Sequence, residues 1–314
     1  MNCPLCAGEN IGPRLALDDD FKLYRCGECG YQFVLRRPSM DELTAVYEPP
    51  PPGTFGEHTT EETKQLGLVY QDLIKTAHPA AKNVLEVGCN AGFILKGLNQ
   101  LGYSVWGTDL SSTAVRAAKE YYGLDSLYLS EFPPEDKAGS FDVLIASHVI
   151  EHVLEPRAFA EQCARFLRND GIIIIRTPNV DSLGMRCFRG HYPVFCPPIH
   201  LNYFSTRTLA SLLDGRFTII RSETGGDWND PRNTIFNCFV AVSHLLGVKK
   251  RLKASTAIKE ADENGTPPPS SLFTRARKVA QISERLLWPV FALASAAGAG
   301  ENILLIARKR GQAW

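Results

Sequence analysis

The sequence lacks an excess of charge, a long hydrophobic run and an internal repeat. Its 34 Lys and Arg residues balance 34 Asp and Glu residues, so the formal net charge is zero at pH 7. Proteins that neutralise nucleic-acid phosphates carry a basic surface, and this balance therefore argues against a nucleic-acid partner. The longest apolar stretch, residues 286–297, is too short to span a bilayer and contains a proline. The first residues, Met1-Asn2-Cys3-Pro4, have neither the basic start nor the apolar core of a secretion signal, so we expect a cytoplasmic protein.

The cysteines do not form the pattern of a disulfide framework. Their number, nine, is odd and their placement uneven, which favours a reducing compartment and metal binding. Four of them form two C-x2-C pairs, Cys3 with Cys6 and Cys26 with Cys29. Each pair presents two thiolates from one tight turn, and the two pairs together predict a closed tetrahedral zinc site of structural type. A segment this small cannot build a sufficient core alone, so we expect the zinc to supply its folding energy.

Residues 84–92 predict a buried strand that runs into a glycine turn. The motif reads Glu86-x-Gly88-x-Asn90-x-Gly92, after which the chain continues with the apolar spacing of a helix. Glycines at the carboxyl end of a parallel strand let the backbone approach a nucleotide-like ligand closely. An acid just before the turn would repel a pyrophosphate but suits a ligand that carries an ammonium group and a sulfonium. Asn90 stands where a middle glycine is common, and Asn tolerates unusual backbone angles better than most residues.

This motif resembles the first motif of class I S-adenosylmethionine-dependent methyltransferases. The run FDVLIASHVIEHV at 141–153 is similar to the fourth strand of members that act on small molecules, glycans and quinones. Residues 171–179 resemble the fifth strand, and 200–205 resemble a frequent later segment. The resemblance covers about residues 83–225, with a last strand near 302–307. It implies an α/β, Rossmann-like fold with a doubly wound, mostly parallel seven-stranded sheet, and S-adenosylmethionine as the cofactor.

Further residues are expected to bind this cofactor. A second strand, 104–109, ends in Asp109, about 20 residues beyond Gly88, where an acid accepts hydrogen bonds from ribose hydroxyls. The resemblance places Leu110 against the adenine and Glu131 near the adenine amine. It also places the acid of the glycine turn near the methionine portion.

A second group of polar residues follows the predicted fourth strand. His148, Glu151 and His152 have the spacing that brings side chains to one face of a turn or short helix. Methyl transfer requires mainly orientation, plus a base when the acceptor is a hydroxyl, and histidine with a pKa of about 6.5 suits that role. His200 is expected to reach the same cleft from the opposite side. We therefore predict these four residues as the catalytic group.

Two alternatives stay open for this group. Histidines at a strand end often only cap a helix or bond to a backbone carbonyl. The four residues are also similar to the Glu-x-x-Glu-His plus distant His of metal-dependent methyltransferases, which implies a second, divalent metal. His148 departs from that pattern, because the first position there is Glu.

The chain divides into five predicted segments. They are a zinc ribbon (1–37), a Pro-rich linker with a leading helix over 57–77 (38–82), the cofactor-binding core (83–225), a loop and helical insertion (226–299), and the last strand with the tail (300–314). The leading helix either packs against the sheet or closes over the cofactor. The insertion combines a proline-rich loop, 260–269, with a basic helix next to residues 286–297. That helix is expected either to pack on the core or a second subunit, or to rest on the inner face of the membrane.

The sequence as a whole predicts a methyltransferase that acts on a small molecule or glycan. Residues 24–43, YRCGECGYQFVLRRPSMDEL, resemble ribbon-containing proteins of surface-polysaccharide clusters, which favours O-methylation of a sugar hydroxyl. One alternative is an RNA base methyltransferase that uses its ribbon for recognition, which the neutral charge disfavours. The other is a non-catalytic, cofactor-binding module whose ribbon recruits partners, which the intact Glu86, Gly88 and Asp109 disfavour.

Overall fold

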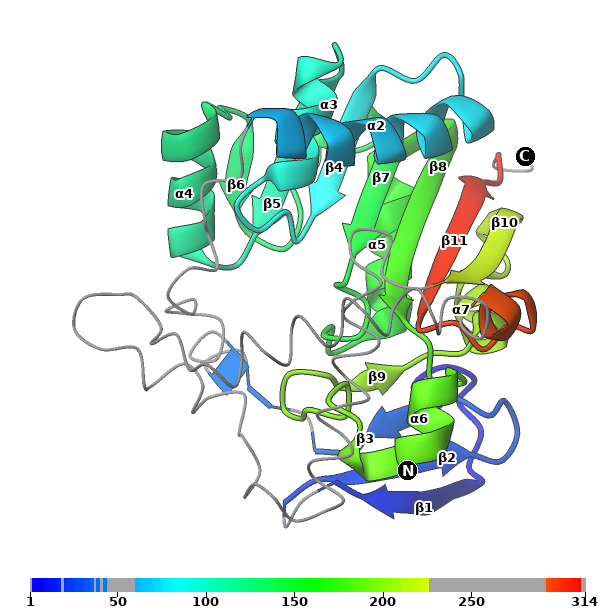
Figure 1. Ribbon diagram of the computed structural model, residues 1–314. Coiled ribbons are helices and arrows are strands. Elements are labelled where there is room, and N and C mark those ends of the chain that lie inside the picture. Colours follow the sequence, from blue (N-terminus) through cyan, green and yellow to red (C-terminus); the bar gives the residue numbers. More distant parts are fainter. Residues whose placement is uncertain are drawn as a thin grey trace, which may run out of the picture.

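A computed structural model describes residues 2–17, 20–36, 38–39, 42–43, 60–225 and 292–311. At its centre is a seven-stranded sheet with the strand order β10-β11-β8-β7-β4-β5-β6 (Figure 1). The strands are β4 (Asn83–Val87), β5 (Ser104–Asp109), β6 (Leu127–Leu129), β7 (Phe141–Ser147), β8 (Leu167–Pro178), β10 (Phe217–Gly225) and β11 (Asn302–Lys309). Only β11 runs antiparallel to its neighbours, β8 and β10. The predicted mostly parallel, seven-stranded α/β sheet is therefore confirmed.

Helices cover both faces of this sheet because its central strands are apolar on both sides. The helices are α2 (Thr60–Ala77), α3 (Phe93–Gln100), α4 (Ser112–Tyr122), α5 (Pro156–Phe166), α6 (Leu183–Phe188) and α7 (Thr206–Leu213), with 3-10 turns η1 (Glu135–Lys137) and η2 (Arg189–His191). Apolar side chains of α2 and α3 pack with Val143, Ile145 and Ile174 on one face. Side chains of α5 and α7 pack with Leu144 and Ile175 on the other. The sheet is thus doubly wound, as predicted.

Most predicted elements agree with the structure to within a few residues. The strand expected at 104–109 coincides with β5, and the one expected near 302–307 continues to Lys309. The strand expected from Gly171 begins earlier, at Leu167, which pairs with Phe141 of β7. The predicted leading helix corresponds to α2, whose Tyr70, Leu73 and Ile74 are buried against the sheet.

A smaller sheet holds the amino-terminal segment. Its strands β1 (Ile11–Ala16), β2 (Lys22–Cys26) and β3 (Gln32–Val34) are joined by β9 (Asn202–Tyr203), in the order β1-β2-β3-β9. The fourth strand thus comes from the segment between α6 and α7, and no sequence pattern predicted it. Figure 1 shows this small sheet at the carboxyl-terminal end of the parallel strands. The ribbon segment is therefore continuous with the core rather than a separate unit.

Several predicted features lie outside the described residues. These are the Pro-rich linker, the proline-rich loop at 260–269 and the basic helix before residue 286; of the 226–299 insertion, the structure describes 292–299. Among the residues that it does describe, no helix has the length and apolarity needed to cross a bilayer.

Two glycines let α2 and α3 approach each other. A methyl group on Gly97 would overlap the carbonyl oxygen of Thr63 and lie 2.7 Å from the Cα atom of Gly67. We expect Gly97→Ala to lower the free energy of unfolding by about 1–3 kcal/mol through overpacking, despite the better helix propensity of Ala. Urea unfolding measures this change. Gly12→Ala, where the added methyl meets open space, is the control; equal effects of both variants would contradict the close packing.

Candidate active site

The turn between β4 and α3 has the backbone geometry that its glycines predict. Gly88, Asn90 and Gly92 have φ angles of 66°, 50° and 79°, in the left-handed region. Asn90 thus adopts the conformation of the glycine it replaces. A methyl group on Gly88 would lie 2.6 Å from a side-chain carbon of Val149, so the turn packs tightly against the segment that follows β7.

Glu86 is a buried acid at the end of β4. Its side chain is 3% exposed, and its Oε2 atom has no hydrogen-bond partner among the described residues. Burial, followed by the nearby charge of Asp109, raises the pKa of Glu86 well above its ordinary value. A buried carboxyl group of this kind gains most from a cationic ligand.

Asp109 ends the neighbouring strand β5 and is anchored to the glycine turn. Its Oδ2 atom accepts a hydrogen bond from the Asn90 amide at 2.8 Å, and its Oδ1 atom accepts one from the Ser111 amide at 2.8 Å. Leu110 follows with 37% exposure, and Leu129 at the end of β6 is 57% exposed. The predicted cofactor residues, including the exposed Glu131, therefore lie along the adjacent ends of β4, β5 and β6.

Glu151 lies at the centre of the second group. Its side chain is 2% exposed; Oε1 lies 3.2 Å from His148 Nδ1, and Oε2 accepts a hydrogen bond from Thr177 Oγ1 at 2.9 Å. Burial acts to raise the pKa of Glu151, but the bond with His148 and the charges of the neighbouring histidines outweigh it and lower the pKa to about 2. Glu151 is therefore an ionised carboxylate at neutral pH.

His152 and His200 lie side by side next to this carboxylate. Their ring centroids are 4.8 Å apart, and His152 Nε2 is 3.9 Å from Glu151 Oε1. His152 Nδ1 lies 2.9 Å from the carbonyl oxygen of Ile199, and His200 Nδ1 lies 2.8 Å from that of Val194. A carbonyl only accepts, so each Nδ1 donates, and Nε2 is the acceptor atom of either ring in its neutral form. Burial, followed by the charge of His152, lowers the pKa of His200 to about 4, which keeps this ring neutral at pH 7.

The structure brings all four predicted catalytic residues together. His148 has a φ angle of 56°, and the chain then forms a turn, which is one of the two predicted conformations. His200 contacts His152 directly instead of facing it across a cleft. The sequence did not lead us to include Thr177 and Asn202 among the site residues. Both are polar residues within apolar, strand-like runs, and this pattern could have identified them.

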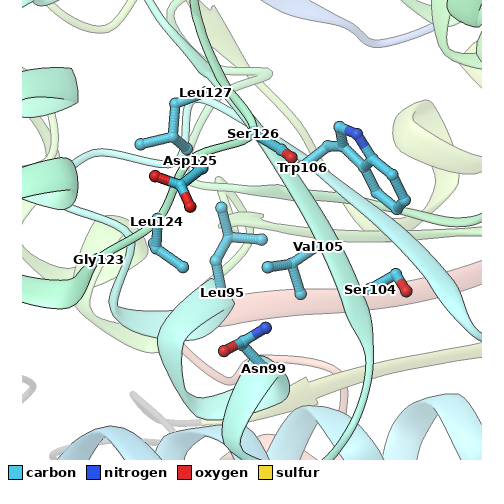
Figure 2. A pocket seen from close by; sticks show the side chains of 10 residues that line it. All are labelled: Leu95, Asn99, Ser104, Val105, Trp106, Gly123, Leu124, Asp125, Ser126 and Leu127. Carbon is cyan, nitrogen blue, oxygen red and sulfur yellow. The ribbon is translucent and has the colours of Figure 1, made fainter.

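One cavity of the structure lies away from this site. Figure 2 shows that it is lined by Leu95 and Asn99 of α3, by Ser104 and Trp106 of β5, and by the loop before β6. It encloses about 320 Å³ near the amino ends of β5 and β6. The glycine turn and the histidines lie at the carboxyl ends, so this cavity is separate from the candidate site.

Comparison with known proteins identifies the family of the chain. Residues 62–216 match the family model described as a methyltransferase domain. The chain is 33% identical over 180 residues to the ubiquinone biosynthesis O-methyltransferase of Caulobacter vibrioides, covering 51% of this chain and 71% of that protein. The chain belongs to the S-adenosylmethionine-dependent methyltransferase family.

Two other known proteins are also similar to the chain. The ubiquinone biosynthesis O-methyltransferase of Psychrobacter cryohalolentis is 34% identical over 129 residues, covering 38% of this chain and 50% of that protein. The chain thus spans about half the length of several curated relatives that it matches. A solved S-adenosylmethionine-dependent methyltransferase from Archaeoglobus fulgidus has a TM-score of 0.46 and 18% identity, covering 80% of this chain and 95% of that one.

The low pKa of His200 predicts a pH-dependent contribution to stability. Between the folded pKa of about 4 and the unfolded value of 6.5, the unfolded chain binds the extra proton, so stability from this residue falls as the pH falls. The fall is at most about 1.4 kcal/mol per pH unit. We expect the unfolding free energy of wild type, minus that of His200→Gln, to fall as the pH decreases from 6.5 to 4. Urea unfolding at each pH measures this difference. A constant difference over this range would contradict the low pKa.

Proposed function

We propose that this methyltransferase-family protein transfers a methyl group to a hydroxyl oxygen of a small molecule. The observation that carries the proposal is the close packing of the glycine turn against the segment that holds the histidines. Val149 lies between His148 and Glu151 in the chain and packs on Gly88 of the cofactor turn. A cofactor at that turn and an acceptor at the histidines are therefore neighbours, which is what an in-line transfer requires.

The glycine turn fits S-adenosylmethionine. The partnerless Oε2 atom of buried Glu86 suits the ammonium of the methionine portion, and Gly88 has no room for a side chain. We assign Asp109 to the ribose hydroxyls, and the exposed Leu110 would offer apolar surface to the adenine. When bound, the cofactor supplies an electrophilic methyl group on a sulfonium.

The histidines provide the base for the acceptor hydroxyl. His152 Nε2 lies 3.9 Å from Oε1 of the ionised carboxylate of Glu151, and Nδ1 of the same ring is engaged by a carbonyl oxygen. With the cofactor bound, His152 Nε2 would take the proton of the acceptor hydroxyl, and Glu151 would stabilise the imidazolium that forms. A base placed in this way contributes about 10²- to 10⁴-fold to the rate. His148 and Thr177 hold Glu151 in position through their hydrogen bonds.

The acceptor itself is proposed from two resemblances. The ribbon sequence favours a sugar hydroxyl, whereas the named relatives are O-methyltransferases of ubiquinone biosynthesis. Sugar nucleotides, glycans and hydroxylated quinone precursors, each tested for methyl acceptance, distinguish these two classes.

The four amino-terminal cysteines fit a structural zinc ion. Cys3 Sγ lies 3.6 Å from Cys29 Sγ, and Cys6 Sγ lies 3.6 Å from Cys26 Sγ. All four sulfur atoms lie within 4.8 Å of one another, as the corners of a thiolate tetrahedron should. Four protein ligands leave no position for substrate, so this zinc would stabilise the ribbon rather than take part in the reaction.

A second candidate role for the histidine group is divalent-metal binding. The ligand atoms of Glu151, His152 and His200 lie within 4.8 Å of one another. Both histidines donate Nδ1 to a backbone carbonyl, an arrangement that orients histidine ligands in metal sites. In that case these three residues would hold the metal, and the metal would polarise the acceptor hydroxyl.

Cofactor binding is tested by calorimetric titration with S-adenosylmethionine. We expect micromolar affinity that Glu86→Gln weakens by about 10- to 100-fold, because a charge-assisted hydrogen bond contributes about 1.5–3 kcal/mol. We do not expect Glu86→Gln to lower the free energy of unfolding. Because the pKa of Glu86 is raised in the folded protein, its ionisation destabilises the fold as the pH rises, and glutamine does not ionise. Asp109→Ala should also weaken binding, whereas Glu120→Gln, on the exposed face of α4, is the control. Undetectable binding by folded wild type would contradict the proposed function.

Metal analysis of the purified protein separates the two roles of the histidine group. We expect one zinc per chain, lost in Cys26→Ser and retained in His200→Gln. A second equivalent of divalent metal that is lost only in His200→Gln would replace the general-base role with the metal role. Absence of zinc from folded wild type would contradict the ribbon assignment.

A further inference from the structure

The segment 199–204 is bonded on one side to the ribbon. Strand β3 pairs with it antiparallel, with Gln32 opposite Tyr203 and Phe33 opposite Asn202. The amide of Val34 also donates to the carbonyl oxygen of Leu201 at 2.9 Å.

The other side of this segment is bonded to the turn that carries Glu151 and His152. The amides of Leu201 and Asn202 both donate to the carbonyl oxygen of Glu151, at 2.8 and 3.0 Å. The carbonyl oxygen of Ile199 accepts the hydrogen bond of His152 Nδ1. A single short segment therefore orients the catalytic turn while being held by the ribbon.

The side chain of Asn202 strengthens this connection. It is 1% exposed, and its Nδ2 atom donates to the carbonyl oxygens of Ile150 at 3.1 Å and Val153 at 2.7 Å. Its Oδ1 atom accepts a hydrogen bond from the hydroxyl of Tyr31 at 2.6 Å. The amide of Asn202 thus spans the turn, and Tyr31 determines which way the amide faces.

Tyr31 in turn depends on the second cysteine pair. The amide of Cys26 donates to the carbonyl oxygen of Tyr31 at 2.9 Å. The ring of Tyr31 is fully buried, with its centroid 5.5 Å from that of Phe33 and 5.2 Å from that of Phe204. A ring packed in this way has little freedom, so its hydroxyl is a fixed donor as long as the cysteine turn keeps its shape.

We propose that Tyr31 is a positioning residue that couples the cysteine ribbon to the catalytic turn through Asn202. Hydrogen bonds connect the ribbon through Tyr31 and Asn202 to the carbonyl oxygens of Ile150 and Val153, and the backbone between these two residues carries His152. The ribbon is then part of the catalytic apparatus and not an appended module. This inference rests on the proposed function in two respects, the zinc at the ribbon and the role of the histidines.

The test uses Tyr31→Phe in the full-length, zinc-loaded chain. This change keeps the buried ring and removes only the hydroxyl. Nitrogen NMR of histidine side chains reports which ring nitrogen carries the proton, without any need for the acceptor. In wild type, we expect His152 to show a single tautomer with the proton on Nδ1. In Tyr31→Phe, we expect the loss of this single-tautomer signature, because the turn and the carbonyl of Ile199 no longer hold one position.

Tyr24→Phe is the matched control. Tyr24 lies in β2 of the same small sheet and is half-buried, so its replacement makes the same chemical change away from Asn202. We expect the His152 signals of this variant to match those of wild type. Cobalt in place of zinc reports by its thiolate absorption whether the ribbon of each variant is intact. Unchanged His152 signals in Tyr31→Phe, or equal changes in both variants, would overturn the inference.

Calorimetry on the same samples separates this inference from the proposed function. S-adenosylmethionine should bind wild type and Tyr31→Phe with affinities that agree within about twofold, because Glu86 and Asp109 lie outside the set of hydrogen bonds. Absence of binding in every sample would reject the proposed function alone, since the histidine signals test the coupling independently. A ribbon whose cobalt spectrum is lost in Tyr31→Phe would mean that the hydroxyl maintains the fold of the ribbon, which also overturns the inference.

Discussion

The candidate site depends on how the buried, ionised carboxylate of Glu151 is stabilised by its neighbours. An isolated charge in a protein interior is unstable, so Glu151 requires hydrogen bonds and neighbouring positive or polarisable groups. His148 and Thr177 provide the hydrogen bonds, and His152 and His200 lie beside it. Gathering these side chains requires the segment around His200 to lie against the turn after β7. The same segment then offers its other side to the ribbon as β9.

The pKa values of the two buried acids, Glu86 and Glu151, are shifted in opposite directions, which suits them to different roles. Glu86 is buried next to another acid, which raises its pKa, and its Oε2 atom has no partner among the described residues. Glu151 is buried next to histidines, which lower its pKa to about 2. The first environment favours the arrival of a cationic ligand, and the second keeps a fixed negative charge beside a proton acceptor. In the proposed function, adjacent strands of one sheet therefore carry a cofactor-binding acid and an acid that supports the catalytic base.

Much of this arrangement was predictable from the sequence. The central strands are short apolar runs, and their carboxyl ends necessarily meet at one edge of a parallel sheet. This is why Glu86, Asp109 and His148 could be assigned to one region. The resemblance assigned His200 to the same region, but its direct contact with the His152 ring was not predictable, because nothing local specifies how a loop after α6 returns to β7. Nor was β9 predictable, since a strand of two residues has no periodicity to detect.

Features that depend on neighbouring residues follow from local sequence: the left-handed turn of Gly88, Asn90 and Gly92, the two cysteine pairs, and the alternation of strands and helices. Their geometry follows from backbone sterics and short-range spacing. The way in which the amino-terminal segment meets the core depends instead on long-range packing. The hydrogen bond between Tyr31 and Asn202 joins residues 171 positions apart. Contacts of this kind depend on how whole elements pack, and packing depends on shape and burial that no local pattern contains.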